Sequence, residues 1–143
     1  MQDRFKFRYF NKYANKMVEP TNYENVDSVF ECIKQQVCFD SNISPLPYDH
    51  IGNGVVFMQC TGLKDKNGKL IYEGDIIEFT DNVNINGSKT HIAKVEHREE
   101  FNAYMYHAEC MGWYTINPSQ NKLFKVKVIG NIYENEELLN GNR

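Results

Sequence analysis

Long apolar segments are missing from this sequence. Its longest purely apolar run is only a few residues, and the first ten residues, MQDRFKFRYF, carry charges where a secretion signal needs an apolar core. We therefore expect neither a membrane span nor export. A length of 143 residues fits one ordinary domain, or one domain with a small appendage.

Cysteines are few and form no tight framework. The 4 cysteines stand at positions 32, 38, 60 and 110. Without a secretion signal, a chain of this kind is expected to keep its cysteines reduced. We interpret them as buried thiols.

Known catalytic signatures are also absent. The sequence has no G-x-S-x-G, phosphate-binding P-loop, H-E-x-x-H or dinucleotide fingerprint, and no serine or cysteine stands in a recognisable nucleophile context. It therefore gives no support for an enzyme, and we predict no cofactor and no metal.

Charge is weak overall but uneven along the chain. The net charge is −3 at pH 7, so the field of the whole protein does not attract nucleic acid. The first 16 residues nevertheless hold five cations against Asp3, whereas the tail holds Glu134, Glu136 and Glu137 against Arg143. The oppositely charged ends would favour a contact between copies, or each end could pack on its own domain.

Aromatic and cationic residues alternate at the N-terminus. Phe5, Phe7 and Tyr9 alternate with cations, which predicts a strand with one aromatic and one cationic face, followed by a turn at 11–15 and a short return strand at 17–18. Phosphates pair with cations and bases stack on aromatic rings. The candidate nucleic-acid contacts are Arg4, Lys6, Arg8 and Lys12; the alternative is an ordinary solvated cationic face.

One amphipathic helix is predicted after this strand pair. Thr21 and Glu24 match a capping box, and apolar residues from Val26 to Val37 follow the spacing of one helical face. Prolines and glycines then predict a loop over 39–54. We place a soft boundary there, between residues 1–54 and 55–143, although the two parts can also form one continuous domain.

Strands and tight turns dominate the rest of the chain. We expect strands at 55–60, 70–72 and 75–80, with Asn67-Gly68 forming a primed hairpin turn and Glu73-Gly74 a second tight corner. Further strands are expected at 90–97, 101–108 and 113–116, then, after a polar stretch at 117–122, from Phe124 into Gly130. Short strands at regular spacing predict a mainly β fold with a small barrel-like body.

Three segments resemble the YopX family of bacteriophage and prophage proteins. They are Lys6-Phe7-Arg8 with Phe10 close behind, MQCTGLKDKNGKLIYEGDII at 58–77, and VIGNIYENEELL at 128–139. The sequence departs at Phe10 and Asn11, where the family tends to have Trp and Asp, and at Glu136, where proline is usual. Residues 81–127 match in strand pattern only.

The resemblance implies a mainly β, phage-encoded protein that can form homo-oligomers in the cytoplasm of the bacterial host cell. It implies no reaction.

Two clusters of polar residues offer chemistry. Glu73 and Asp75 flank Gly74 and could act as an acid and base or bind a divalent cation, but carboxylates beside a glycine corner commonly accept backbone N–H bonds. We favour that structural role for the hairpin motif Asn67, Gly68, Tyr72, Glu73, Gly74 and Asp75.

The second cluster is His91, His97, His107 and Cys110. It lacks the second short-spaced pair of a structural zinc site, so surface or partly buried histidines are the better interpretation.

The sequence thus favours a non-enzymatic oligomeric module that binds or scaffolds a phage or host protein. Nucleic-acid binding through the N-terminal strand is the alternative, and an enzyme using Glu73 and Asp75 comes third.

Overall fold

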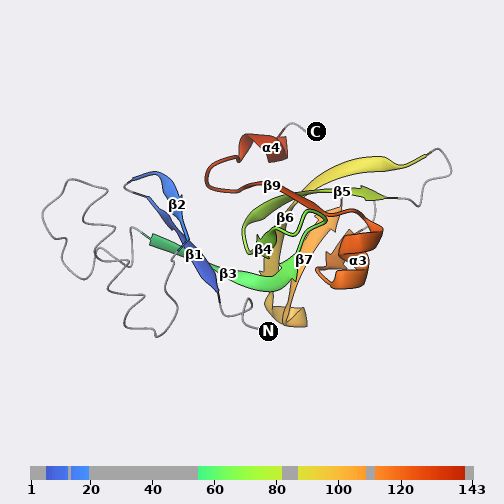
Figure 1. The fold of residues 1–143 in the computed structure, drawn as a ribbon, viewed down its shortest axis with the longest axis horizontal. Helices are drawn as coiled ribbons and strands as arrows, with labels where there is room; N and C mark the ends of the chain where they lie inside the picture. The colour runs from blue at the N-terminus through green and yellow to red at the C-terminus, as the bar shows by residue number, and fades with distance from the viewer. Residues whose placement is uncertain (1–5, 13, 20–54, 82–86, 109–111, 141–143) are drawn as a thin grey trace, which may run out of the picture. The chain divides into compact units, whose positions relative to one another are not determined.

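The computed structural model describes residues 6–12, 14–19, 55–81, 87–108 and 112–140 (Figure 1). The predicted helix after Thr21 and the predicted loop at 39–54 lie outside these ranges. The described chain is mainly β, as the sequence predicted. Two compact units divide at Gln59 and Cys60, within a strand, whereas the predicted boundary followed residue 54.

The first unit contains a small antiparallel ladder. Strand β1 (Phe7–Asn11) pairs with β2 (Lys16–Val18) on one side and with the first half of β3 (Val55–Lys64) on the other. The predicted N-terminal strand and its return strand are confirmed.

The expected cationic face of β1 is wrong at Arg8, which is only 4% exposed. A period of two assigns residues to faces, but β1 lies between two strands and both of its faces are covered from Arg8 onward.

The second half of β3 pairs with β4 (Leu70–Tyr72). The turn between them differs from the predicted primed turn, because Gly68 alone has a positive φ, of 82°. The carboxylate of Asp65 instead organises a longer turn by accepting hydrogen bonds from the N–H groups of Asn67 and Lys69, at 2.8 and 2.9 Å. A side-chain acceptor here takes over the role of a backbone turn.

A five-stranded antiparallel sheet forms the body of the second unit. Its order is β8-β7-β6-β5-β9. The strands are β5 (Asp75–Asp81), β6 (Lys89–Arg98), β7 (Ala103–Ala108), β8 (Gly112–Thr115) and β9 (Lys127–Asn131). Gly74, with φ of 79°, makes the predicted corner before β5, and the 3-10 turn η2 (Glu99–Phe101) joins β6 to β7. The predicted strands at 75–80, 90–97, 101–108 and 113–116 are confirmed to within a few residues.

One face of this sheet carries the hydrophobic core. Tyr106, which is fully buried, has its ring 4.7 Å from Phe79 and 5.6 Å from Tyr114. Apolar side chains recur at every second position on β5 and β6, as a half-buried strand requires. The core residues are Ile71, Ile77, Phe79, Ala93, Val95, Tyr106, Ile116, Phe124, Val126 and Val128.

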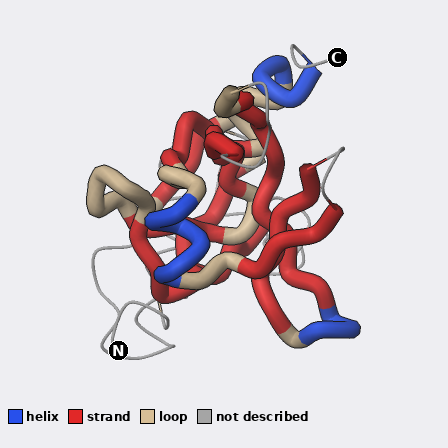
Figure 2. The backbone as a smooth tube through the Cα atoms, turned by 90° about the vertical axis from the view of Figure 1, so that its right-hand side faces the viewer, coloured by secondary structure: helices blue, strands red, loops and turns tan. Residues whose placement is uncertain are grey.

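Two short helices were not predicted. Helix α3 (Pro118–Leu123) replaces the expected polar stretch, and α4 (Glu137–Asn140) follows β9. The side chain of Asn117 caps α3 by accepting from the N–H of Gln120 at 2.9 Å, and Pro118 occupies the first turn, where proline suits a helix. Figure 2 shows the helical segments as short pieces, with α4 near the C-terminus.

The predicted strand from Phe124 begins later. Phe124 is the C-cap residue of α3. Lys125 then takes a left-handed conformation with φ of 52°, and β9 starts at Lys127. The alternation of Phe124, Val126 and Val128 therefore reports burial, not a continuous strand. Within the described ranges, no helix has the length and apolar character needed to cross a membrane.

Candidate functional site

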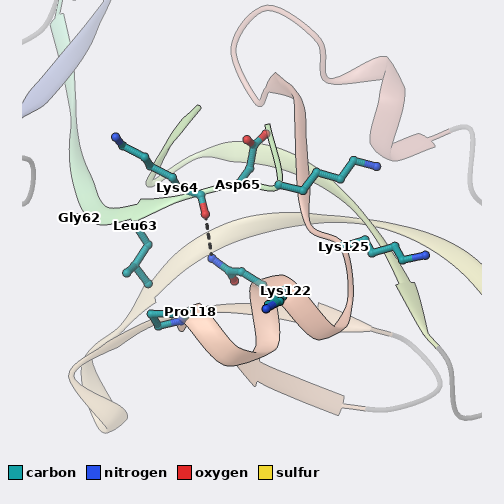
Figure 3. Close-up of a pocket in the computed structure, with 9 residues that line it drawn as sticks. Gly62, Leu63, Lys64, Asp65, Pro118, Lys122 and Lys125 are labelled. Atoms are coloured by element: carbon teal, nitrogen blue, oxygen red, sulfur yellow. Dashed lines mark hydrogen bonds between the residues drawn. The ribbon is translucent and has the colours of Figure 1, made fainter. Parts of the chain in front are cut away.

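A lysine-rich pocket lies between the β3–β4 turn and helix α3 (Figure 3). Its volume is about 550 Å³. Figure 3 shows Leu63 pointing toward α3, whereas the side chains of Lys64 and Lys125 extend away from each other on opposite sides. The lining residues are Gly62, Leu63, Lys64, Asp65, Lys66, Pro118, Asn121, Lys122 and Lys125. We call this group the lysine pocket.

The β3–β4 turn is held in place by one side-chain bond to β9 and one backbone bond to the residue Val126 before it. Asp65 Oδ2 accepts a hydrogen bond from the N–H of Val128 at 2.9 Å, and the N–H of Lys66 donates to the carbonyl of Val126 at 2.8 Å. With the two bonds inside the turn, the Asp65 carboxylate accepts from three backbone N–H groups. One wall of the lysine pocket is therefore a fixed part of the fold.

Asn121 in α3 connects the helix to the β3–β4 side of the pocket. Its side chain is nearly buried, at 4% exposure, and its Nδ2 donates to the carbonyl of Lys64 at 3.4 Å. Its Oδ1 has no hydrogen-bond partner in the part of the chain that the structure describes. Because Nδ2 faces a carbonyl, the amide orientation is set, and a buried acceptor is left unsatisfied.

The charge of the lysine pocket is strongly positive. Lys64, Lys66, Lys122 and Lys125 are all exposed. The single carboxylate in the lining, Asp65, is buried and already engaged by backbone donors. The exposed groups at this place are therefore cations, which attract an anion even though the whole chain is acidic.

A second feature is the outer edge of β8, the last strand of the sheet. The N–H of Ile116 donates to the carbonyl of Tyr104 at 2.9 Å. Since alternate residues of an antiparallel strand point their N–H groups to opposite sides, Trp113 and Thr115 direct theirs away from β7. The β8 sequence, GWYT, contains no charge and no proline.

Beside this edge, an aromatic and cationic cluster covers the outer face of the sheet. The guanidinium carbon of Arg98 lies 4.4 Å from the ring centroid of Trp113, and the ring of His107 lies 5.0 Å from it. Met105, at 7% exposure, is buried on the same face. The side chain of Trp113 is 39% exposed, and large aromatic rings of this kind are enriched at protein interfaces.

The predicted nucleic-acid contacts within the described residues differ in exposure. Arg8 is buried, Lys6 is half-buried and Lys12 is exposed, while Arg4 lies outside the described residues. Of the three described cations, only Lys12 is fully exposed to a phosphate backbone.

Glu73 and Asp75 are separated by their surroundings. Asp75 is fully buried, and its Oδ2 accepts from the N–H of Tyr72 at 2.8 Å. Burial raises the pKa of Tyr104 and Tyr133, and the negative charge of nearby Glu73 adds to both shifts. Asp75 therefore serves the turn, whereas Glu73 lies near two phenol groups.

The histidines also serve different environments. His91 Nε2 lies 2.6 Å from Asp81 Oδ2, His97 packs against Tyr104, and His107 packs against Trp113. The strand register places His97 and His107 on opposite faces of the sheet. Cys110 lies outside the described residues, and within them no three His, Cys, Asp or Glu side chains cluster as a metal site would need.

Sequence reasoning missed the lysine pocket. No sequence pattern marks Lys64 or Lys66 as binding residues, and Lys122 belongs to the stretch predicted to be polar. The one signal that was available is the Asn117-Pro118 helix start, which turns that stretch into a helix with Asn121 and Lys122 one turn later. The juxtaposition of the two segments, 57 positions apart at the Asn121 to Lys64 bond, depends on the tertiary fold.

Comparisons with known proteins agree with this fold. The family model described as YopX protein matches residues 6–140. No curated protein matches the chain. Among solved structures, the crystal structure of protein EF1440 from Enterococcus faecalis is similar, with a TM-score of 0.56 and 24% identity, covering 94% of this chain and 96% of that one. This likeness shows a shared fold alone, whereas the family model spans most of the sequence: the chain belongs to the YopX protein family.

Proposed function

We propose that the protein is a non-enzymatic binding module whose copies assemble through the outer edge of β8. The observation that carries the proposal is this edge, with N–H groups of Trp113 and Thr115 directed outward from an uncharged strand. On this proposal it is a phage or prophage accessory protein that acts in the bacterial cytoplasm as a scaffold for another protein.

The character of the β8 edge supports pairing. Natural sheets protect free edges with charges, prolines or covering segments, and the residues of β8 supply neither charge nor proline. The exposed ring of Trp113 adds an apolar contact beside the edge. Such an edge is suited to receive another strand.

A second copy of this chain is the occupant that the edge suits. Two identical β8 edges meeting antiparallel around a two-fold axis can pair the outward N–H groups with carbonyl groups of the other copy. The carbonyl of Thr115 also accepts from Asn117 Nδ2 at 3.3 Å. Since β8 carries no charge, the pairing brings no like charges together. The homo-oligomers implied by family resemblance agree with this arrangement.

The mass of the protein in solution tests the proposal. We expect light scattering after gel filtration to give a dimer or a larger assembly for the unchanged protein. Thr115→Pro removes one outward N–H without removing a bond to β7, and should lower the assembly constant at least about tenfold, a loss of about 1.4 kcal/mol.

Thr115→Val is the matched control, because it keeps the N–H and the β-branched shape. A strict monomer at high concentration for the unchanged protein would overturn the proposal. So would equal assembly of the Pro and Val variants, each with an unchanged circular dichroism spectrum.

A further inference from the structure

We propose that Glu73, Tyr104 and Tyr133 form a binding site for an organic ammonium group, supplied either by a lysine side chain of another protein or by a small free amine. We call these three residues the Glu73 site. None of them belongs to β8, so the inference goes beyond the assembly through that edge.

Backbone bonds at the β4–β5 corner bring two parts of the Glu73 site together. The N–H of Gly74 donates to the carbonyl of Val95 at 2.9 Å, and the carbonyl of Gly74 accepts from the N–H of Ile132 at 2.9 Å. Glu73 precedes Gly74 and Tyr133 follows Ile132. The carboxylate and the first phenol are therefore carried by two neighbouring segments that are bonded to each other.

The third residue comes from the strand pair that the corner touches. On β6, His97 lies two positions after Val95, and so on the same face of the sheet. His97 is opposite Tyr104 in the β6–β7 register, and their ring centroids are 5.1 Å apart. The bond from Gly74 to Val95 thus brings the corner beside the strand pair that carries Tyr104.

The carboxylate of Glu73 lies within electrostatic reach of both phenols but is bonded to neither. Burial is the main cause that raises the pKa of Tyr104 and of Tyr133, and the charge of Glu73 is the second cause at both. Among the described residues, no hydrogen bond or ion pair engages the Glu73 carboxylate. A half-buried carboxylate loses hydration, and here no donor of the fold replaces it.

An ammonium group supplies what the Glu73 site lacks. It has a positive charge for the carboxylate and three N–H donors, which carboxylate and phenol oxygens can accept. The faces of tyrosine rings also attract cations. An anion would be repelled by Glu73. A metal ion would need a closer set of ligands, and within the described ranges no three His, Cys, Asp or Glu side chains gather.

Glu78 provides a matched comparison within the same part of the chain. It is half-buried like Glu73, but in the β5–β9 register it lies opposite Lys127. The charge of Glu78 therefore has an opposite charge across the strands, whereas Glu73 has two phenols. A change of either glutamate to glutamine removes the same charge and keeps nearly the same shape.

The binding experiment titrates the full chain, labelled with nitrogen-15, and follows its amide signals by NMR. The probes are Nα-acetyl-lysine amide, n-butylammonium, tetramethylammonium and the uncharged Nα-acetyl-norleucine amide. We expect the capped lysine to bind at least about tenfold more tightly than the capped norleucine, with shifts centred on residues 73, 104 and 133, and to bind more weakly as salt is raised. Tetramethylammonium, which has the charge but no N–H donor, should bind more weakly than n-butylammonium.

Two of these probes distinguish the source of the amine. Tighter binding of the capped lysine than of n-butylammonium assigns the site to a lysine side chain of a protein. The reverse order assigns it to a small free amine.

The variants locate the site. Glu73→Gln should lower the affinity for the better amine at least about tenfold, and Tyr104→Phe, which keeps the ring but removes the hydroxyl, should lower it several-fold. Glu78→Gln is the control and should bind as the unchanged protein does. Melting temperatures show that each variant is folded.

Three results would overturn the inference. They are equal affinity for capped lysine and capped norleucine, an equal loss in Glu73→Gln and Glu78→Gln, and tetramethylammonium binding as tightly as n-butylammonium. A monomeric protein that still binds amines would contradict only the assembly through β8, so the two proposals fail separately.

Discussion

The two edges of the five-stranded sheet differ in whether another segment bonds to them. At one edge, β9 is reached by the β3–β4 turn, whose Asp65 accepts from the N–H of Val128. At the other edge, β8 pairs with β7 alone among the described strands, and the N–H groups of Trp113 and Thr115 point outward. Among the described residues, this sheet thus has one edge covered by a turn, the closed edge, and one edge without a partner strand, the open edge.

The difference shows how a small β protein can protect one edge of a sheet against strand addition and leave the other edge unprotected. The closed edge is covered by a turn that carries lysines, and covering segments and lysines are devices that prevent strand addition. The open edge uses aromatic and uncharged residues. Closing β9 also creates the lysine pocket, because the turn that covers the strand is one wall of the hollow.

Removing the Asp65 carboxylate should have the largest effect on stability. Asp65→Ala leaves three backbone N–H groups without their acceptor, among them the buried bond to Val128. We expect a loss of about 3 kcal/mol in the free energy of unfolding by urea. Lys69→Ala changes the same turn without removing an acceptor and is the control. Equal stability of the two variants would show that the turn does not hold the closed edge.

A methyl group at Gly130 should come next. An added Cβ would lie 2.6 Å from Asn135 Oδ1 and 2.8 Å from Asn135 Cβ, so the turn after β9 must shift. The Asn135 Oδ1 that it displaces accepts from the N–H of Asn131 at 3.2 Å. We expect Gly130→Ala to cost about 2 kcal/mol in thermal unfolding.

Gly68→Ala is its control, with open space around the Cβ but a strained φ of 82°. A smaller loss at Gly130 than at Gly68 would mean that the close approach is easily relieved.

Lys125→Gly should change stability in the opposite direction. The left-handed φ of 52° favours glycine, so we expect a gain of about 1 kcal/mol in the free energy of unfolding. Lys122→Gly, in the regular part of α3, should lose about 1 kcal/mol for the entropy of a helical glycine. If Lys125→Gly and Lys122→Gly lost the same amount of stability, the backbone at Lys125 would be unstrained.

The smallest effect concerns Tyr106, beneath the open edge beside Tyr114. Burial raises the pKa of Tyr106, so the folded state favours the neutral phenol. That contribution to stability is complete below the unfolded pKa of about 10, and it is lost as the pH rises toward the higher folded value. Its hydroxyl has no partner among the described residues, so Tyr106→Phe should be nearly neutral at pH 7.

Melting temperatures measured from pH 7 to alkaline pH check this. The unchanged protein should lose stability more steeply than the Phe variant in the alkaline range. Tyr9→Phe, at a fully buried tyrosine of the first unit, is the comparison. Parallel alkaline curves for unchanged protein and Tyr106→Phe would remove Tyr106 as the cause.

Several elements followed directly from local sequence. Glu73-Gly74 predicted a tight corner because only glycine adopts a φ near 80° without strain, and Gly74 does so. The alternation of apolar and polar residues from Thr90 to Ala108 predicted the β6–β7 hairpin, because side chains of a strand point to opposite faces in turn. The Asn67-Gly68 turn was placed correctly but assigned the wrong type, since Asp65 competes for the backbone donors from outside the dipeptide.

Other features required contacts between distant segments. Arg8 was expected in solvent because the pattern of β1 shows which face a residue takes, not whether that face is covered. The cations of the lysine pocket were unremarkable turn and helix residues until α3 lay against the β3–β4 turn.

The sequence alone determined the mainly β fold class, most strand positions and the YopX resemblance, because these depend on residue periodicity, turn chemistry and short motifs. The tertiary structure alone decided which edge of the sheet is open, which carboxylates are used by backbone donors and where lysines gather. Those outcomes depend on long-range pairing, in which a residue's neighbours are fixed by packing and not by its position in the chain.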